Sequence, residues 1–263
     1  MDPPDYDGLL EHMKALAAAD QRVLGLLLYG SRVTGKADAF SDLDLGVITT
    51  DAGARELVRE RAALLAQVGE VLFLEDFGDP THTHAILADG AAFEFIVRPI
   101  GELVDDGPHQ IVLDKDGQVA AALARKVARE PEVFSAEGVR RQIQYFWHEV
   151  EHLVTALGRR DLLWAHGGLE EMRGICLRLA RAAAGVDAED EEPYWKVDTA
   201  LDAELLERLR ATIVPAETAP MRRAAGELLE IYRSLAHPLA ERNGIAYPER
   251  LDALLSARLG SGR

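Results

Sequence analysis

The chain has little of three things: cysteine, basic charge and long apolar runs. Its 263 residues include a single cysteine, Cys176, so no disulfide can form within the chain. No apolar run approaches the roughly 18 residues that a membrane-spanning helix needs. The 29 basic residues are outnumbered by 45 acidic ones, which gives a formal net charge of −16. Since a nucleic-acid partner needs a basic patch, we expect neither a nucleic-acid nor a membrane partner.

The composition is otherwise that of a globular protein with a sizeable core, because 48% of the residues are hydrophobic. A chain of this length holds one large domain or two medium ones. The first seven residues are acidic where a signal peptide is basic, so we expect the protein in the cytoplasm. The acidic balance suits a cationic small molecule as a ligand, although charge alone identifies no ligand.

Residues 23–48 contain two apolar runs separated by a turn of small residues. The first run, Leu24 to Tyr29, ends at Gly30-Ser31, which predicts a buried strand that leads into a tight turn. Without a Cβ atom, Gly30 lets backbone N–H groups approach an anion, and Ser31 adds a hydroxyl donor. The turn could therefore hold phosphate oxygens.

The second run carries two aspartates in an alternating pattern, from Asp42 to Val47. Because side chains alternate along a strand, Asp42 and Asp44 are predicted on one face, roughly 6.6 Å apart. Both carboxylates could reach one hard cation or share a pair of cations. The alternative is a glycine turn followed by a strand with two solvated aspartates.

The first half of the chain alternates helix and strand patterns. An Asp-Gly dipeptide between apolar runs is a strong hairpin signal, and Asp89-Gly90 predicts one between residues 84 and 98. On its second arm Glu94 faces away from Phe93 and Phe95. The other predicted elements are helices over residues 6–19 and 51–67 and strands over residues 24–29, 71–75 and 110–113, the last followed by turn residues from Asp114 to Asp116.

Strand patterns end near residue 130, which predicts domains over residues 1–130 and 131–263. The second domain reads as a helical bundle with two apolar stripes, followed by helices over residues 201–209, 221–239 and 251–259. The second stripe includes Leu162, Leu163 and Leu169. The expected fold class is therefore α+β, with a mixed sheet and flanking helices followed by a helical bundle.

One stretch of the helical half points to a different enzyme. His148-Glu149-Val150-Glu151-His152 matches His-Glu-x-x-His, in which two histidines bind zinc and the glutamate polarises water. The substrate-binding motifs of such zinc metallopeptidases are lacking. An alternative use of the same helix is a polar stripe of Tyr145, His148, Glu149 and His152 that lines a cleft.

The Gly-Ser turn, ten residues and Asp-x-Asp together resemble the signature of the nucleotidyltransferase superfamily that includes DNA polymerase beta. Over most of its length the chain is similar to the antibiotic nucleotidyltransferases, which are the aminoglycoside and lincosamide adenylyltransferases. Residues 20–45 carry most of this resemblance, with weaker echoes at 112–117 and 146–166. It implies a nucleotidyltransferase domain, a helical substrate-binding domain, and Mg²⁺-dependent transfer of AMP from ATP to a hydroxyl of such an antibiotic, hence antibiotic resistance.

The resemblance also implies a role for each site residue. Asp42 and Asp44 would hold two Mg²⁺ ions roughly 3.5 to 4 Å apart. Glu94 matches the superfamily's third carboxylate and would either complete the metal site or take the proton of the attacking hydroxyl; otherwise it is an exposed residue of an edge strand. The nucleotide would contact Gly30, Ser31, Arg32 and Lys196, and the acceptor would contact Tyr145, Glu149, Trp164 and His166. A further alternative is a non-catalytic, antitoxin-like binding protein with the same fold.

Overall fold

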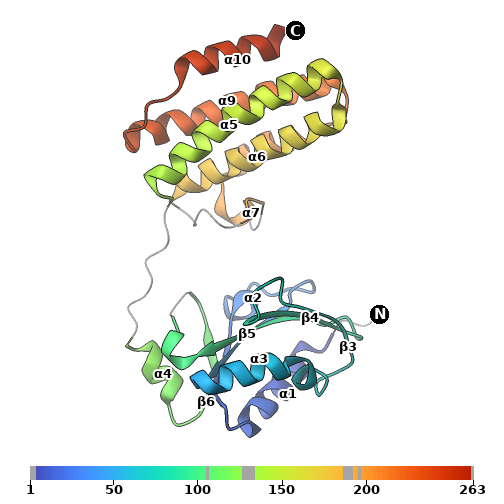
Figure 1. The fold of residues 1–263 in the computed structure, drawn as a ribbon, viewed down its shortest axis with the longest axis vertical. Helices are drawn as coiled ribbons and strands as arrows, with labels where there is room; N and C mark the ends of the chain where they lie inside the picture. The colour runs from blue at the N-terminus through green and yellow to red at the C-terminus, as the bar shows by residue number, and fades with distance from the viewer. Residues whose placement is uncertain (1–3, 105–106, 126–133, 186–191, 195–196, 262–263) are drawn as a thin grey trace. The chain divides into compact units, whose positions relative to one another are not determined.

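The computed structural model describes residues 4–104, 107–125, 134–185, 192–194 and 197–261. It divides into two compact units, Met1–Arg129 and Glu130–Arg263 (Figure 1). The first unit contains all the described strands, and the described residues of the second unit form helices and their connections, with no strand. The predicted α+β fold class is confirmed.

A mixed sheet of six strands forms the centre of the first unit, in the order β3-β4-β5-β2-β1-β6. β2 (Leu43–Thr49) runs parallel to β5 (Ala92–Pro99), and the other neighbouring strands are antiparallel. The predicted hairpin is confirmed, although its first arm begins at residue 82. The remaining strands are β1 (Val23–Leu28), β3 (Val71–Glu75), β4 (His82–Leu87) and β6 (Gln110–Asp114).

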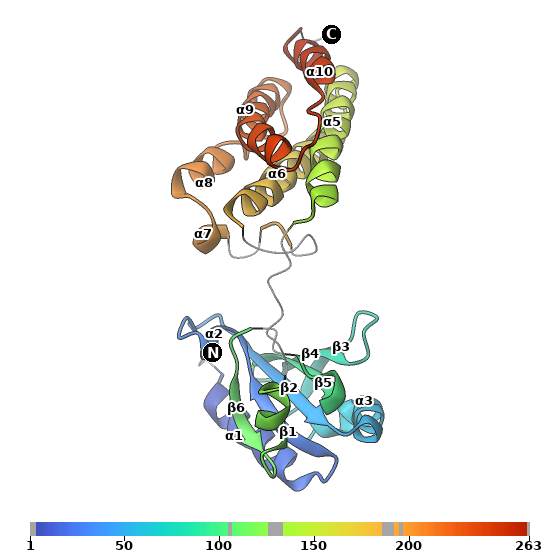
Figure 2. The same ribbon diagram turned by 90° about the vertical axis from the view of Figure 1, so that its left-hand side faces the viewer.

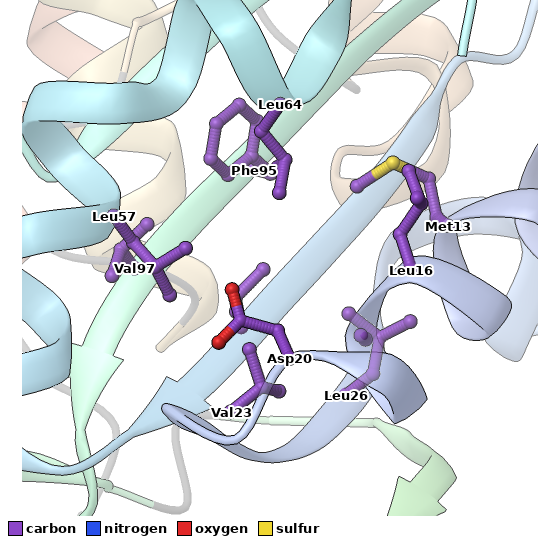
Figure 3. A pocket seen from close by; sticks show the side chains of 11 residues that line it. Met13, Leu16, Asp20, Val23, Leu26, Leu57, Leu64, Phe95 and Val97 are labelled. Atoms are coloured by element: carbon purple, nitrogen blue, oxygen red, sulfur yellow. The ribbon is translucent and has the colours of Figure 1, made fainter. Parts of the chain in front are cut away.

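Two helices, α1 (Tyr6–Ala19) and α3 (Asp51–Leu65), pack on one face of this sheet (Figure 1). Each begins after a side chain, Asp5 or Thr50, that accepts a backbone N–H of the first turn. Figure 3 shows an apolar cavity on this face, with Met13 and Phe95 among its lining side chains. Its volume of about 20 Å³ admits a single water, so it is too small for a nucleotide.

A smaller cluster of buried apolar residues lies on the opposite face of the sheet. Leu27 and Ile48 pack there against Val119 and Leu123 of α4 (Gln118–Leu123) and against Leu103, which follows the short helix η1 (Ile100–Glu102). The sequence did not predict α4. The Asp114 carboxylate starts this helix by accepting the backbone N–H groups of residues 119 and 120, both at 2.9 Å.

The second unit is a bundle in which α5 (Ala136–Arg159) packs on α6 (Leu162–Ala184) and α6 packs on α9 (Thr218–Arg242) (Figure 2). α10 (Glu249–Ser261) contacts α5 and α9. In the core the rings of Phe146 and Tyr232 stack 3.7 Å apart, and the Tyr232 hydroxyl donates to the Ile143 carbonyl. Within the described part of the chain, no helix combines the length and hydropathy needed to cross a membrane.

One detail of the predicted bundle is wrong, and one predicted helix has shifted boundaries. Leu163 belongs to the predicted apolar stripe but is 84% exposed, because it lies in the first turn of α6 on the side away from the core. The helix predicted over residues 201–209 is α8 (Ala203–Arg210), which begins two residues later, and the short helix α7 (Val197–Ala200) precedes it. Asp202 lies between them and caps α8 by accepting two of its backbone N–H groups.

Candidate functional site

The turn after β1 contacts Asp44. The Tyr29 backbone N–H donates to the Asp44 carbonyl at 3.0 Å, and the next residue, Gly30, has a φ of +73°. A Cβ atom on Gly30 would lie 1.9 Å from Asp44 Oδ2, so any other residue here would force this carboxylate to move. The chain then forms the single helical turn α2 (Gly30–Val33). Glycine is therefore required here for its backbone angle and for the closeness of Asp44.

Three polar residues form a row across three neighbouring strands. Asp44 of β2 is in register with Glu94 of β5, and Glu94 is in register with His84 of β4. Residues in register on adjacent strands lie about 5 Å apart with their side chains on the same face. β5 lies between β4 and β2, so the edge-strand alternative for Glu94 is wrong. The sheet thus brings the second aspartate and the glutamate together, as the resemblance implies.

Glu94 is held by two histidines that the sequence did not place in the site. Its Oε2 lies 2.9 Å from His82 Nε2, and its Oε1 lies 2.8 Å from His84 Nδ1. The two imidazole rings stack with their centroids 4.5 Å apart. The spacing His-x-His could have identified these two residues as a pair, because residues two apart on a strand share a face.

Asp42 immediately precedes β2, which begins at Leu43. Its carbonyl accepts a hydrogen bond from Arg32 Nε at 3.2 Å. The Arg32 guanidinium also lies 4.5 Å from the centre of the Tyr6 ring and 3.8 Å from Asp7 Oδ1. Arg32 thus joins α1 and α2 to the segment that carries Asp42, and its contact with phosphate stays a prediction.

Of the two remaining predicted nucleotide contacts, Ser31 and Lys196, the structure describes only Ser31. Ser31 lies in α2, and its carbonyl accepts the Lys36 N–H at 2.9 Å and the Thr34 hydroxyl at 3.2 Å. These bonds fix the turn that follows Gly30. Lys196 lies outside the described residues.

In the helical unit, α5 and α6 bring four aromatic side chains into one series. Ring centroids are 5.7 Å apart between Tyr145 and His148, 4.0 Å between His148 and His152, and 5.6 Å between His152 and Trp164. Two of the predicted acceptor residues, Tyr145 and Trp164, therefore belong to one surface. His166, also on α6, is exposed and is not part of this series.

An open pocket of about 620 Å³ lies beside Tyr145, between α5 and α6. Burial raises the pKa of Tyr145, and the negative charges of Glu149 and Glu171 raise it further, so the phenol keeps its proton at neutral pH. The sequence did not place Glu171 with the acceptor residues. The pocket is lined by Arg141, Gln142, Gln144, Tyr145, His148, Glu171 and Arg178.

The zinc-like motif of α5 forms a compact group. Ligand atoms of His148, Glu149 and His152 all lie within 4.8 Å of one another. Glu149 is 6% exposed, and its Oε1 is 3.8 Å from His152 Nδ1. The glutamate is thus buried beside the histidine ring, whereas a zinc peptidase uses it on a water molecule.

Residues 5–259 match the family model described as streptomycin adenylyltransferase. The chain belongs to this family. It is therefore a nucleotidyltransferase enzyme, which confirms the predicted enzyme class and disfavours the non-catalytic alternative. The match also includes the motif from His148 to His152, so the family places that motif in an adenylyltransferase sequence and not in a peptidase.

Solved structures provide further comparisons for this streptomycin adenylyltransferase family member. An aminoglycoside 6-adenyltransferase from Bacillus subtilis is 16% identical, with a TM-score of 0.48 and 97% of each chain covered. A nucleotidyltransferase-like protein from Exiguobacterium sibiricum 255-15 is 11% identical, with a TM-score of 0.37 and coverage of 97% of this chain and 88% of that one. No curated protein matches the chain.

Nucleotidyltransferases generally use a nucleoside triphosphate and a divalent metal, and the carboxylate of Asp44 beside Gly30 fits such an ion. Asp42 and Asp44 offer carboxylate oxygens, which are the ligands that Mg²⁺ prefers. The Asp44 carboxylate occupies space that the Cβ atom of any other residue at position 30 would fill. The residues around Asp44, at the start of β2, are therefore compatible with a bound magnesium nucleotide.

Proposed function

We propose that this family member transfers AMP from ATP to a hydroxyl of an aminoglycoside of the streptomycin type in a Mg²⁺-dependent reaction. The observation that carries the proposal is that Asp44 is in register with Glu94 and in contact with Gly30. The family supplies the reaction class and suggests the acceptor. Such a reaction would inactivate the antibiotic and confer resistance.

Each residue of the first unit then has a distinct task. Asp42 and Asp44 would hold Mg²⁺, which supplies charge neutralisation at the α-phosphate and the pyrophosphate when it is bound. Gly30 and Ser31 would contact the β- and γ-phosphates. Glu94 would accept the proton of the attacking hydroxyl. A carboxylate oxygen that accepts one hydrogen bond keeps a second lone pair, so Glu94 can do this while the two histidines hold it.

The acceptor is proposed to bind the helical unit at the face that carries Tyr145 and Trp164. Aromatic rings attract cationic groups, and the carboxylates of Glu149 and Glu171 add negative charge next to Tyr145. Streptomycin-type antibiotics are polycations, so this combination suits them. The predicted contact from His166 is retained only on the resemblance, since this residue is not part of the aromatic series.

The purified protein should add a nucleotidyl group to an aminoglycoside when it is incubated with ATP and Mg²⁺. Mass spectrometry of a panel containing streptomycin, a second aminoglycoside and a lincosamide measures the added mass. Reactions without Mg²⁺ or with GTP in place of ATP are the controls. Modification of the lincosamide alone would overturn the proposed acceptor class, and modification of none of the three would overturn the proposed function.

Loss of the Tyr145 ring should weaken acceptor binding and leave nucleotide binding unchanged. In Tyr145→Ala we expect the KM for the acceptor to rise about tenfold, which corresponds to about 1.4 kcal/mol. The KM for ATP should stay within about twofold, because Tyr145 is proposed to contact only the acceptor. Steady-state kinetics with each substrate varied in turn measure both constants.

Glu204→Gln is the matched control, because Glu204 is an exposed residue elsewhere in the same unit, on α8. Its kinetic constants should equal those of the parent protein. A Tyr145→Ala enzyme with an unchanged KM for the acceptor would remove this face from the acceptor site.

A further inference from the structure

The group of His82, His84 and Glu94 has the composition of a transition-metal site. Ligand atoms of the three residues lie within 4.8 Å of one another, and each glutamate oxygen already faces a different imidazole nitrogen. The side chains are 33%, 30% and 35% exposed, respectively, so an ion can reach them from solvent. Two imidazoles and one carboxylate are a donor set that binds Zn²⁺ with one coordination position left open.

The sheet fixes these three residues in position. His82 and His84 share a face of β4, because they are two residues apart, and His84 is in register with Glu94. The loop before His82 is also held: the Asp79 carboxylate accepts the Thr81 N–H at 2.9 Å, and the His82 N–H donates to the Asp79 carbonyl at 3.0 Å. The ligand atoms are thus presented by paired strands and do not depend on a free loop.

Only a small movement separates the observed hydrogen bonds from metal ligation. The nitrogen-to-oxygen distances are now 2.9 Å for His82 and 2.8 Å for His84. Two ligands about 2.05 Å from a tetrahedral Zn²⁺ lie about 3.3 Å apart. Separating the atoms by about half an ångström therefore makes room for the ion, and this is within the reach of side-chain rotations.

We propose that His82, His84 and Glu94 bind a borderline transition-metal ion, with Zn²⁺ as the best fit, at a site separate from Asp42 and Asp44. Mg²⁺ does not compete for it effectively, because Mg²⁺ prefers oxygen ligands and two of the three donors are imidazoles. The ion displaces the two hydrogen bonds on Glu94 and takes its carboxylate as a ligand.

Occupation of this site blocks nucleotidyl transfer, and this consequence rests on the proposed function. Glu94 is in register with Asp44 and is the group proposed to accept the hydroxyl proton. A carboxylate that ligates Zn²⁺ is a weaker proton acceptor, because the cation withdraws its charge. Zn²⁺ is therefore expected to inhibit the enzyme at concentrations at which Mg²⁺ supports it.

The site is tested by zinc binding to the full chain in millimolar Mg²⁺ without nucleotide, measured against a chromophoric chelator. The parent protein should bind Zn²⁺, and His82→Ala/His84→Ala should bind it at least about 100-fold more weakly, because two of three ligands are lost. His12→Ala, which removes an exposed histidine of α1, should bind as the parent does. Circular dichroism confirms that each variant is folded.

The second compact group, His148 with Glu149 and His152, requires its own control. His148→Ala/His152→Ala should keep the tight zinc site, and Co²⁺ in this variant should still give the intense visible absorption of a tetrahedral site with nitrogen ligands. Zinc binding that survives in the His82/His84 double variant but is lost here would overturn the proposal. So would the absence of binding in the parent protein.

The transfer assay then separates this inference from the proposed function. Zn²⁺ should inhibit the parent enzyme, and EDTA followed by excess Mg²⁺ should restore its rate. Zinc that binds through these residues and leaves the rate unchanged would overturn the inhibitory role. If no acceptor is modified under any condition, the proposed function fails, and the binding measurement still decides whether the metal site exists.

Discussion

Asp44→Asn should lose Mg²⁺-dependent nucleotidyl transfer by at least about 10³-fold and keep its fold. Asparagine has nearly the same shape as aspartate, but its neutral amide cannot neutralise a bound cation or the charge that develops on the phosphates. Asp44 is also the residue in contact with Gly30 and in register with Glu94, so the change falls at the centre of the site. The rate of pyrophosphate release with ATP and the acceptor measures the loss.

The control for this variant is Asp51→Asn. Asp51 is an exposed residue that follows β2 at its other end, so the same charge is removed from the same region of the fold. This enzyme should turn over at nearly the parent rate. Turnover by Asp44→Asn at the rate of its control would contradict the assignment of Asp44 as a metal ligand.

Gly30→Ala should abolish most of the activity at a modest cost in stability. The new Cβ would lie 1.9 Å from Asp44 Oδ2, so the Asp44 carboxylate must move out of its position. We expect a loss of transfer of at least about 10²-fold, as is found when a catalytic group is displaced by about an ångström. The positive φ adds about 1–2 kcal/mol of destabilisation, measured by urea denaturation.

Gly35→Ala separates the steric effect from the backbone effect. Gly35 has a φ of +70°, close to the +73° of Gly30, but a Cβ there would meet nothing within 4 Å. We expect a similar loss of stability and nearly full activity. Equal losses of activity in the two variants would mean that strain in the turn, and not displacement of Asp44, explains the effect of Gly30→Ala.

The sequence predicted the strands that carry the site because their patterns are local. Alternation around Asp44 and Glu94 identified both strands, and the Asp-Gly turn identified the hairpin between β4 and β5. The parallel pairing of β2 with β5 joins segments about 50 residues apart, and no local pattern fixes such a register. The row from Asp44 through Glu94 to His84 could therefore be anticipated only in part.

Other features depend on contacts that a linear pattern does not contain. The role of Gly30 beside Asp44 arises from the packing of the turn against β2, which is a tertiary contact. The start of α4 depends on two hydrogen bonds to the Asp114 carboxylate, which the sequence indicated only as a turn residue. The Tyr145 stripe was visible in the helical spacing of α5, whereas the addition of Trp164 required the packing of α6 on α5.

The central claim is that Asp44 and its neighbours bind a metal nucleotide, and isothermal titration of ATP into the protein tests it most directly. With Mg²⁺ present, the parent protein and Asp51→Asn should bind ATP with the same affinity, and chelation of the metal should remove binding in both. Asp44→Asn should bind at least about tenfold more weakly under the same conditions. Binding that is equally tight in Asp44→Asn, or that is unchanged when Mg²⁺ is removed, would contradict the claim.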